Sequence, residues 1–229
     1  MSWIEEAKKL AAFSAVDFVK DGDIVGLGSG STASYAVSEL GRRVTEEKLN
    51  ILGIPTSIKT ESLAKTSGIP LTDLDSNPIP DIAIDGADQV DQGLQLIKGM
   101  GAALVREKVV DSAAKKVIIV VDETKLTSKL GLDQIVPIEI ISFALGFVKN
   151  KLTAMGTVPV LRHDSKNLPL ITDNGNYLLD VNFGVISDPY SLEHKINMIP
   201  GVIECGLFLD IADVVCIGGR NDLSILERK

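Results

Sequence analysis

The sequence has few cysteines and no long apolar run. Cys205 and Cys216 are the only cysteines among 229 residues, and they form no CxxC motif, which argues against a disulfide framework or a cysteine-rich zinc site. The N-terminal segment mixes acids and lysines, unlike a signal peptide, and no run approaches the ~18 apolar residues of a membrane span. These absences predict a soluble, cytoplasmic protein with no membrane partner.

Basic residues are outnumbered by acidic ones. The formal net charge is −8 and the isoelectric point is near 4.8, which argues against the basic face that nucleic-acid-binding proteins use. We therefore expect no nucleic-acid partner, and an anionic ligand must meet a local positive site. The 45% of hydrophobic residues are enough for a substantial core, in one large domain or two modest ones.

The sequence does contain a regular alternation of strand-like and helix-like segments. After a helical period from Trp3 to Val19, buried strands are predicted at 24–28, 49–54, 80–85 and 116–121. Helices are predicted between them at 33–44, 55–68 and 101–115. This order is typical of a parallel sheet with helices on both faces, and thus of an α/β fold.

Beyond about residue 132 the order of elements changes. We expect strand 135–140, helix 141–152, strands 157–163 and 176–183, helix 190–199 and strand 201–209. The order βαββαβ matches the ferredoxin-like motif and predicts a small α+β domain over residues 132–207. The apolar segment 213–219 is expected to return to the first sheet, so the main domain combines residues 1–131 with 208–229.

The segment GLGSGST (26–32) closes a predicted strand and opens a predicted helix. Backbone N–H groups at such a helix start suit a phosphate. The segment is no dinucleotide fingerprint, because Ser31 stands where the third glycine is needed, and no Gly-Lys-Ser/Thr follows to make a P-loop. A tight turn capped by Ser31 or Thr32 explains the loop equally well.

The segment DGADQVD (85–91) carries three aspartates at intervals of three. Asp85 follows an apolar strand, where open α/β sheets place their ligands, and Asp88 follows one turn later. EF-hand calcium loops space their first ligands two apart, so this pattern is not an EF-hand. Capping of the next turn and magnesium binding by one or two carboxylates both stay open from the spacing alone.

A lysine and a glutamate complete the set of candidate residues. Lys98 precedes the glycine-rich segment GMG (99–101), where backbone approaches a ligand easily and a lysine can stabilise an oxyanion. Glu107 lies on the next predicted helix, at the edge of a wide apolar stripe. In such a dry place a carboxylate has a raised pKa and can act as a general base. The alternatives are an exposed lysine at a strand end and a solvated glutamate paired with its basic neighbours.

Four motifs in this order, GLGSGSTA, DGADQVD, KGMGAALVREK and VDETK, resemble the type A ribose-5-phosphate isomerases across most of the chain. In that family the first loop usually reads Gly-Thr-Gly-Ser-Thr and the third Lys-Gly-Gly-Gly. Here Ser29 replaces the threonine and keeps a hydroxyl, while Met100 replaces a glycine.

The resemblance implies a Rossmann-like main domain with an inserted ferredoxin-like domain, assembled as a homodimer or homotetramer. It implies interconversion of ribose 5-phosphate and ribulose 5-phosphate in the pentose phosphate pathway, without metal or organic cofactor. Carried over by residue, Glu107 is the base, and Asp85, Asp88 and Lys98 surround the reacting oxygens. The substrate contacts it implies are Ser29, Gly30, Ser31, Thr32, Asp85, Gly86, Ala87, Asp88, Lys98, Gly99, Met100, Gly101 and Lys125.

Two other functions compete with this one. An amino-sugar phosphate deaminase of similar architecture is expected to use an active-site histidine, but the only histidines, His163 and His194, fall in the small-domain region and are more simply surface or core side chains. A sugar-phosphate sensor would normally carry a DNA-reading module, and no helix-turn-helix or basic face precedes residue 24. Retention of Glu107 favours catalysis.

Overall fold

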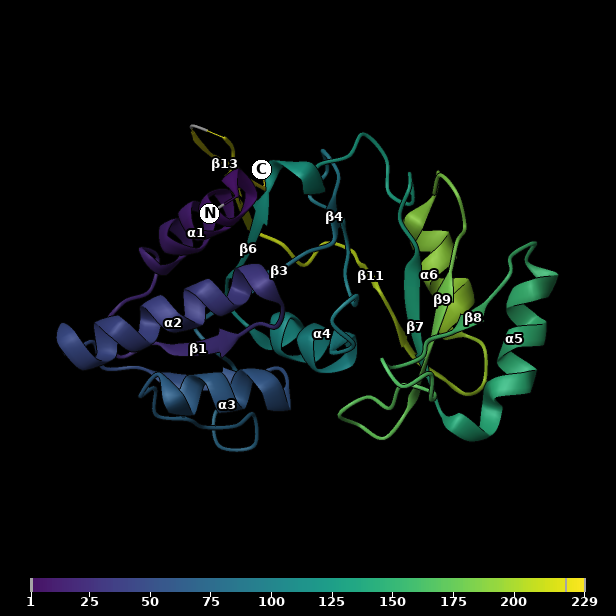
Figure 1. The fold of residues 1–229 in the computed structure, drawn as a ribbon, viewed down its shortest axis with the longest axis horizontal. Helices are drawn as coiled ribbons and strands as arrows, with labels where there is room; N and C mark the ends of the chain where they lie inside the picture. Colours follow the sequence, from purple (N-terminus) through teal and green to yellow (C-terminus); the bar gives the residue numbers. More distant parts are fainter. Residues whose placement is uncertain (1, 221, 229) are drawn as a thin grey trace. The chain divides into compact units, whose positions relative to one another are not determined.

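Six strands form the larger of the sheets in this computed structural model, which describes residues 2–220 and 222–228 (Figure 1). Their order is β13-β12-β6-β3-β1-β2, and all neighbours are parallel except β12 and β13. The strands are β1 (Ile24–Leu27), β2 (Leu52–Pro55), β3 (Ile82–Gly86), β6 (Val117–Asp122), β12 (Val214–Gly218) and β13 (Leu223–Glu227).

Alternate residues of each strand in this sheet face opposite sides, and different helices cover the two faces. One face carries Val25, Leu27, Ile84 and Ile118 into a core shared with α1 (Trp3–Val16) and α2 (Ser31–Glu46). Figure 1 shows α1, α2 and α3 (Ile58–Thr66) stacked beside one another. The residues between them in sequence, such as Gly26 and Ala83, belong to the other face, which α4 (Leu104–Ala113) covers.

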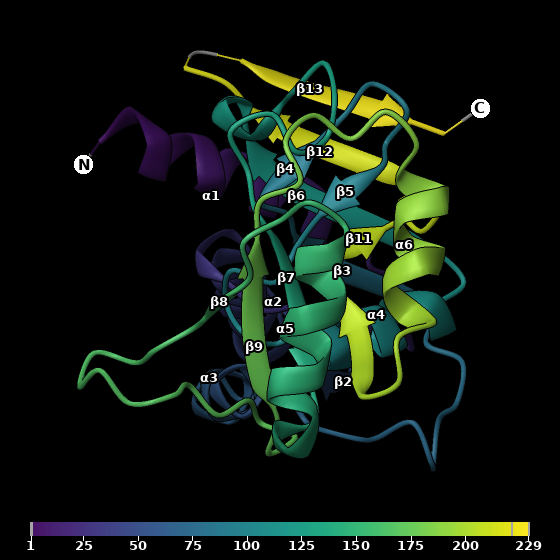
Figure 2. The ribbon, with the colours of Figure 1, turned by 90° about the vertical axis from the view of Figure 1, so that its right-hand side faces the viewer.

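A second compact unit holds an antiparallel sheet of order β10-β7-β9-β8. Its helices α5 and α6 lie over the same face, as Figure 2 shows, and bury Val148, Leu152 and Ile196 against it. A small sheet of order β11-β5-β4 belongs to the same unit. The elements are β4 (Gln89–Val90), β5 (Leu96–Ile97), β7 (Val136–Ile140), α5 (Leu145–Ala154), β8 (Val160–Leu161), β9 (Tyr177–Val181), α6 (Pro189–Asn197), β10 (Val202–Cys205) and β11 (Leu207–Phe208).

The predicted fold class is confirmed: a parallel-sheet core and a separate βαββαβ unit are both present. The compact units comprise residues 1–87, 106–126 and 210–229 in the first, and 88–105 and 127–209 in the second. The second unit thus extends the predicted range 132–207 by residues 88–105, 127–131 and 208–209. We keep 132–207 as the proposed inserted domain, because this range contains all six elements of the βαββαβ order, from β7 to β10.

Several predicted elements are shorter or split in the structure. The helix expected over 101–115 begins at Leu104, because Gly99 and Ala102 have positive φ values of 105° and 63° that interrupt a helix. The strand expected over 201–209 is two strands in different sheets. Gly206 separates them, and its missing side chain leaves room for the Pro137 ring, which a Cβ would meet at 2.9 Å.

Other differences concern helix 141–152 and the chain's last strand. The predicted helix is a 3-10 turn (Ser142–Ala144) followed by α5, and strand 157–163 shortens to β8. The return of segment 213–219 to the first sheet is confirmed by β12, and the strand-like run predicted to end at Lys98 is confirmed by β5, whereas β4 and β13 were not predicted. Among the described residues, no helix is both long and apolar enough to cross a membrane.

Candidate active site

The predicted site residues are distributed over both units, and each half can be described by itself. The first unit contributes Ser29–Thr32, Asp85–Ala87, Glu107 and Lys125. The second contributes Asp88 and Lys98–Gly101. Asp85, Lys98 and Glu107 are 0%, 2% and 4% exposed, which is unusual for charged side chains and marks all three as residues held in place by their surroundings.

In the first unit the glycine loop and Asp85 lie against each other. The Ser29 N–H donates to Asp85 Oδ1 at 3.0 Å, and the Gly86 N–H donates to the same oxygen at 2.6 Å. Gly28 approaches so closely that a Cβ there would overlap the Asp85 side chain. Asp85 therefore fixes the loop to the end of β3, and the glycine is required by the close approach of two backbones.

Below the loop, four hydroxyls form a connected network. Ser29 Oγ donates to Ser57 Oγ at 2.8 Å and lies 2.9 Å from Thr56 Oγ1. Ser57 Oγ donates to Thr60 Oγ1, which in turn donates to the Gly28 carbonyl, both at 3.0 Å. The Ser29 hydroxyl is thus hydrogen-bonded to side chains at the start of α3. Sequence analysis did not single out Thr56, Ser57 or Thr60, although the segment TSIKTE (56–61) directly follows β2.

Helix α2 begins directly after this loop, with Gly30 at φ 107° as its N-cap. Within the described residues, no hydrogen bond is recorded from the N–H groups of Gly30, Ser31 or Thr32. The first turn of the helix carries no acidic residue. Orphan N–H donors and the positive end of the helix dipole together suit a phosphate dianion.

Glu107 lies in the first turn of α4, on the face that covers the sheet. Val110, one turn later, contacts Gly26 of β1 so closely that a Cβ on Gly26 would come within 2.6 Å of it. Because α4 precedes the parallel strand β6, it runs back along the sheet from the carboxyl edge. Glu107 is therefore nearer that edge than Val110 and lies on the same face of the sheet as Asp85.

Lys125 closes a short 3-10 turn, Glu123–Lys125, after β6. Asp122, 1% exposed, caps this turn by accepting hydrogen bonds from the Thr124 N–H at 3.0 Å and from the Thr124 hydroxyl. The turn follows the carboxyl end of its strand, as the loops at Ser29 and Asp85 do. Lys125 is half-buried and supplies a cation at that edge of the first sheet.

In the second unit Asp88 and the second glycine loop are joined by hydrogen bonds. The Asp88 N–H donates to the Ile97 carbonyl at 2.8 Å, and the Met100 N–H donates to Asp88 Oδ2 at 3.0 Å. Lys98, predicted either as a site residue or as an exposed strand end, is buried, with its ammonium 5.1 Å from the centre of the Phe208 ring. Met100 is 47% exposed and points away from the core.

The family model of ribose 5-phosphate isomerase A (phosphoriboisomerase A) matches residues 52–222. A ribose-5-phosphate isomerase A from Methanothermobacter thermautotrophicus is 50% identical over 221 residues, covering 96% of this chain and 97% of its own. The chain belongs to the ribose 5-phosphate isomerase A family. A family member from Thermosynechococcus vestitus is 48% identical over 217 residues, covering 94% of this chain and 92% of its own.

Solved structures of isomerases agree with this assignment. The chain is similar to the ribose 5-phosphate isomerase A of Methanocaldococcus jannaschii, with a TM-score of 0.94, 43% identity and coverage of 97% of this chain and 99% of that one. It is also similar to a D-ribose-5-phosphate isomerase in complex with phospho-erythronic acid, with a TM-score of 0.96, 43% identity and full coverage of both chains. The resemblance expected from the motifs is confirmed.

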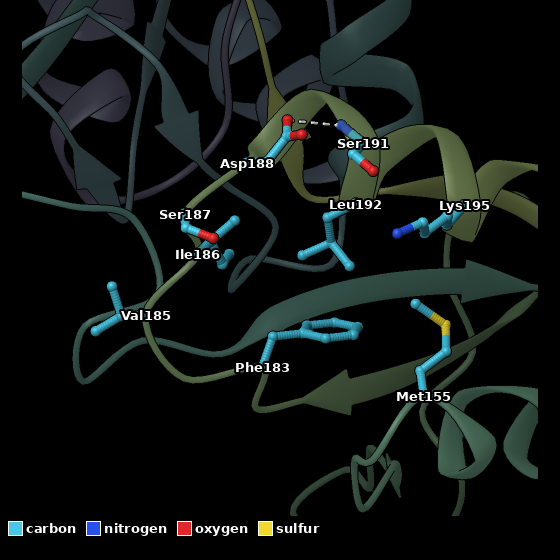
Figure 3. Close-up of a pocket in the computed structure, with 9 residues that line it drawn as sticks. All are labelled: Met155, Phe183, Val185, Ile186, Ser187, Asp188, Ser191, Leu192 and Lys195. Atoms are coloured by element: carbon cyan, nitrogen blue, oxygen red, sulfur yellow. Dashed lines mark hydrogen bonds between the residues drawn. The ribbon is translucent and has the colours of Figure 1, made fainter.

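One pocket of the second unit is lined by none of the predicted site residues. This pocket, of about 410 Å³, is lined by Phe183, Ile186, Leu192 and Lys195, among others (Figure 3). Its acid, Asp188, accepts the Ser191 N–H at 3.0 Å and caps α6. No residue carried over from the family lines it.

Both histidines of this isomerase-family chain are exposed, which confirms His163 and His194 as surface side chains.

Among the described residues, one group of side chains could hold a metal ion. Side-chain ligand atoms of Glu193, Glu204 and Cys205 lie within 4.8 Å of one another in the second unit, and none of these residues belongs to the predicted site. Glu204 Oε1 already accepts hydrogen bonds from Asn197 and from the Cys205 N–H. Asp85 and Asp88 have oxygen ligands suited to magnesium, but backbone N–H groups donate to one oxygen of each.

Proposed function

We propose that the protein interconverts D-ribose 5-phosphate and D-ribulose 5-phosphate through an enediolate, as an aldose-ketose isomerase of the non-oxidative pentose phosphate pathway. The observation that carries the proposal is the full-length similarity to isomerases, including one in complex with phospho-erythronic acid. In this acid, a carboxylate can occupy the place of the enediolate oxygens. The buried Glu107 and Lys98 are the groups this chemistry needs.

In the proposed reaction Glu107 removes the proton from C2 of the open-chain aldose. The C–H electron pair forms the C1–C2 double bond, and the negative charge develops on the carbonyl oxygen at C1, where the Lys98 ammonium stabilises it. Protonated Glu107 then delivers the proton to C1, and a hydroxyl proton moves from O2 to O1. The ketose results with all atoms and electrons conserved. One base serves both carbons because they are adjacent.

The loop Ser29–Thr32 is the proposed phosphate-binding loop, and Lys125 the proposed cation beside it. The N–H groups at the start of α2 provide donors without a competing acid in that turn. Gly86, Ala87, Gly99, Met100 and Gly101 are proposed to contact the substrate through their backbone. Because the chain carries a net charge of −8, these local donors must overcome the long-range repulsion of a phosphate.

The first test is ketose formation from ribose 5-phosphate in excess EDTA, with Glu107→Gln as the paired variant. Wild-type activity is expected to persist in EDTA, because no step uses a metal. In Glu107→Gln kcat should fall by about 10²- to 10⁴-fold, the usual contribution of a general base. A wild type that binds ribose 5-phosphate without converting it would contradict the proposal and favour a sugar-phosphate sensor.

Asp85 and Asp88 are proposed to handle hydroxyl protons and to assist opening of the furanose ring. Glu107→Gln blocks isomerisation, so ring opening can be measured in that background as exchange between the two anomers of ribose 5-phosphate by NMR. Adding Asp88→Asn or Asp85→Asn then identifies the residue that ring opening requires. We expect Asp88→Asn to slow the exchange, because Asp85 Oδ1 accepts two backbone N–H groups whereas Asp88 Oδ2 accepts one. Equal slowing by both substitutions would contradict this division.

We also propose the cytoplasm as the location, since Cys205 and Cys216 are buried and form no disulfide, which is the state that reducing compartments maintain. Assembly as a homodimer or homotetramer stays a prediction. Light scattering of the purified protein over a range of concentrations measures it directly.

A further inference from the structure

Arg162, in the second unit just after β8, has a side chain that is 11% exposed and contacts the second glycine loop. Its Nη1 donates to two consecutive carbonyl oxygens, of Gly99 at 2.9 Å and of Met100 at 3.1 Å. Its Nε is 3.1 Å and 2.9 Å from the two carboxylate oxygens of Asp180 on β9, and Nη2 donates to Oδ1 of the same carboxylate and lies 4.0 Å from Met100 Sδ. Asp180 therefore balances the charge of the guanidinium on one side, and on the other side the guanidinium binds and orients the backbone carbonyls of the loop.

The two carbonyls that Arg162 binds belong to peptide units whose N–H groups are those of Met100 and Gly101. In a planar trans peptide the C=O and the N–H point in opposite directions. Holding both carbonyls on the Arg162 side thus directs both N–H groups to the other side. There the Met100 N–H donates to Asp88 Oδ2 at 3.0 Å. Arg162 and Asp88 accordingly contact opposite sides of the same peptide.

We infer that Arg162 and Asp180 are positioning residues for the isomerase reaction: they hold the Gly99–Gly101 backbone so that its N–H groups face Asp88 and the substrate. The expected effect on catalysis rests on the proposed function. The hydrogen bonds from which the inference is argued all lie within the second unit. Gly99, at φ 105°, and the neighbouring glycine at 101 give the loop backbone freedom, which the guanidinium restricts.

The test compares Arg162→Ala and Asp180→Asn with wild type. A misplaced loop reduces stabilisation of the transition state more than it reduces substrate binding. Arg162→Ala is therefore expected to lower kcat by about 10- to 100-fold with a smaller change in KM. Asp180→Asn should change kcat in the same direction by less. Arg162→Lys keeps the charge but not the planar fork, so it should restore little of the lost activity.

A double-mutant cycle with Asp88→Asn separates positioning from general structural damage. If Arg162 acts through the peptide that donates to Asp88, adding Arg162→Ala to Asp88→Asn should cost less than about 3-fold in kcat. Glu139→Gln is the matched control. Glu139 is a fully buried acid on β7 of the same sheet, and its Oε1 accepts hydrogen bonds from Thr172, Asn174 and Asn176 at 2.9–3.0 Å. This variant should lower thermal stability and leave kcat nearly unchanged.

Amide exchange measured by NMR without substrate provides a readout that does not depend on the reaction. The Met100 amide should exchange at least ~10-fold faster in Arg162→Ala than in wild type. Unchanged exchange, or equal losses of kcat in the wild-type and Asp88→Asn backgrounds, would overturn the inference. A wild type without isomerase activity would overturn the proposed function instead, and the exchange result would still decide the loop's dependence on Arg162.

Discussion

At the scale of single residues, the first half of the site depends on close approach. Gly28 lies against Asp85, and the Gly28 N–H donates to the Ile84 carbonyl at 2.9 Å, so β1 and β3 are fixed together directly beside the loop. A side chain at this position has no room except by displacing Asp85 or β1. The identity of residue 28 thus controls where a candidate catalytic carboxylate lies.

Gly28→Ala is expected to lower the free energy of unfolding by about 1–3 kcal/mol, as overpacking of a tight contact does, and to reduce kcat/KM. Chemical denaturation and the isomerase assay measure the two effects. Gly146→Ala on α5 is the matched control, because a Cβ there meets no atom within 4 Å. It should raise the unfolding free energy by about 0.5–1 kcal/mol without loss of activity. A Gly28→Ala variant with wild-type stability and activity would contradict the described packing.

Sequence reasoning proposed candidate site residues from short motifs whose residue types and spacing are unusual. Asp85, Lys98 and Glu107 were selected from short motifs, and all three are buried. Arg162 and Asp180 were not selected, since an arginine and an aspartate 18 positions apart carry no local signal. Their pairing depends on the adjacency of β8 and β9, which only the folded sheet reveals.

At the scale of elements, Asp81 joins the start of β1 to the segment after α4. Its Oδ2 accepts the Ile24 N–H at 2.9 Å, and its Oδ1 accepts from Lys115 Nζ at 2.7 Å. The Lys115 ammonium, followed by the Ile24 N–H, lowers the pKa of Asp81 below its ordinary value. A lowered pKa in the folded state means that ionised Asp81 stabilises the fold above the unfolded-state pKa and that this contribution is lost as the pH falls through the folded-state pKa.

Asp81→Asn should therefore destabilise the protein by about 1 kcal/mol at pH 7, after allowance for solvent screening. The difference from wild type should shrink as the pH falls below about 4, where the wild-type carboxyl becomes protonated. Urea denaturation at pH 7, 5 and 3.5 measures it. A difference that is constant over this range would show that the charge of Asp81 does not contribute.

Element prediction succeeded where burial produces long apolar runs and failed where tertiary contacts decide. The strands β3, β6 and β12 were predicted within two residues at each end, because a parallel sheet buries them on both faces. The pairs β4–β5 and β5–β11 involve two residues per strand, which is too few for their antiparallel pairing to be recognised in the sequence. Strand β13 is exposed throughout, so its sequence lacks a buried face.

At the scale of the whole molecule, a ligand that binds only the native state should stabilise it. Phospho-erythronic acid, seen in complex with a similar isomerase, is expected to raise the melting temperature of this protein and to inhibit it. At 100 times its Kd the gain is about 2.7 kcal/mol in the free energy of unfolding. Differential scanning fluorimetry measures the shift, with inorganic phosphate as the control ligand. A Lys98→Met variant should lose most of the melting-temperature shift that phospho-erythronic acid produces. An equal shift with inorganic phosphate would mean that only the phosphate is recognised.

The first unit is assembled from both ends of the chain, and this affects how the protein can be made in the cell. Helix α1 lies against β12 so closely that a Cβ on Gly218 would overlap the Ala7 backbone. Strand β12 also pairs with β6 along five residue positions. While a ribosome is still adding the residues before 214, α1 has no β12 to cover and β6 has an open edge. The second unit has all of its residues by position 209, so it can fold on the nascent chain before the first unit is complete, and chaperones that shield exposed strand edges would act on the first unit.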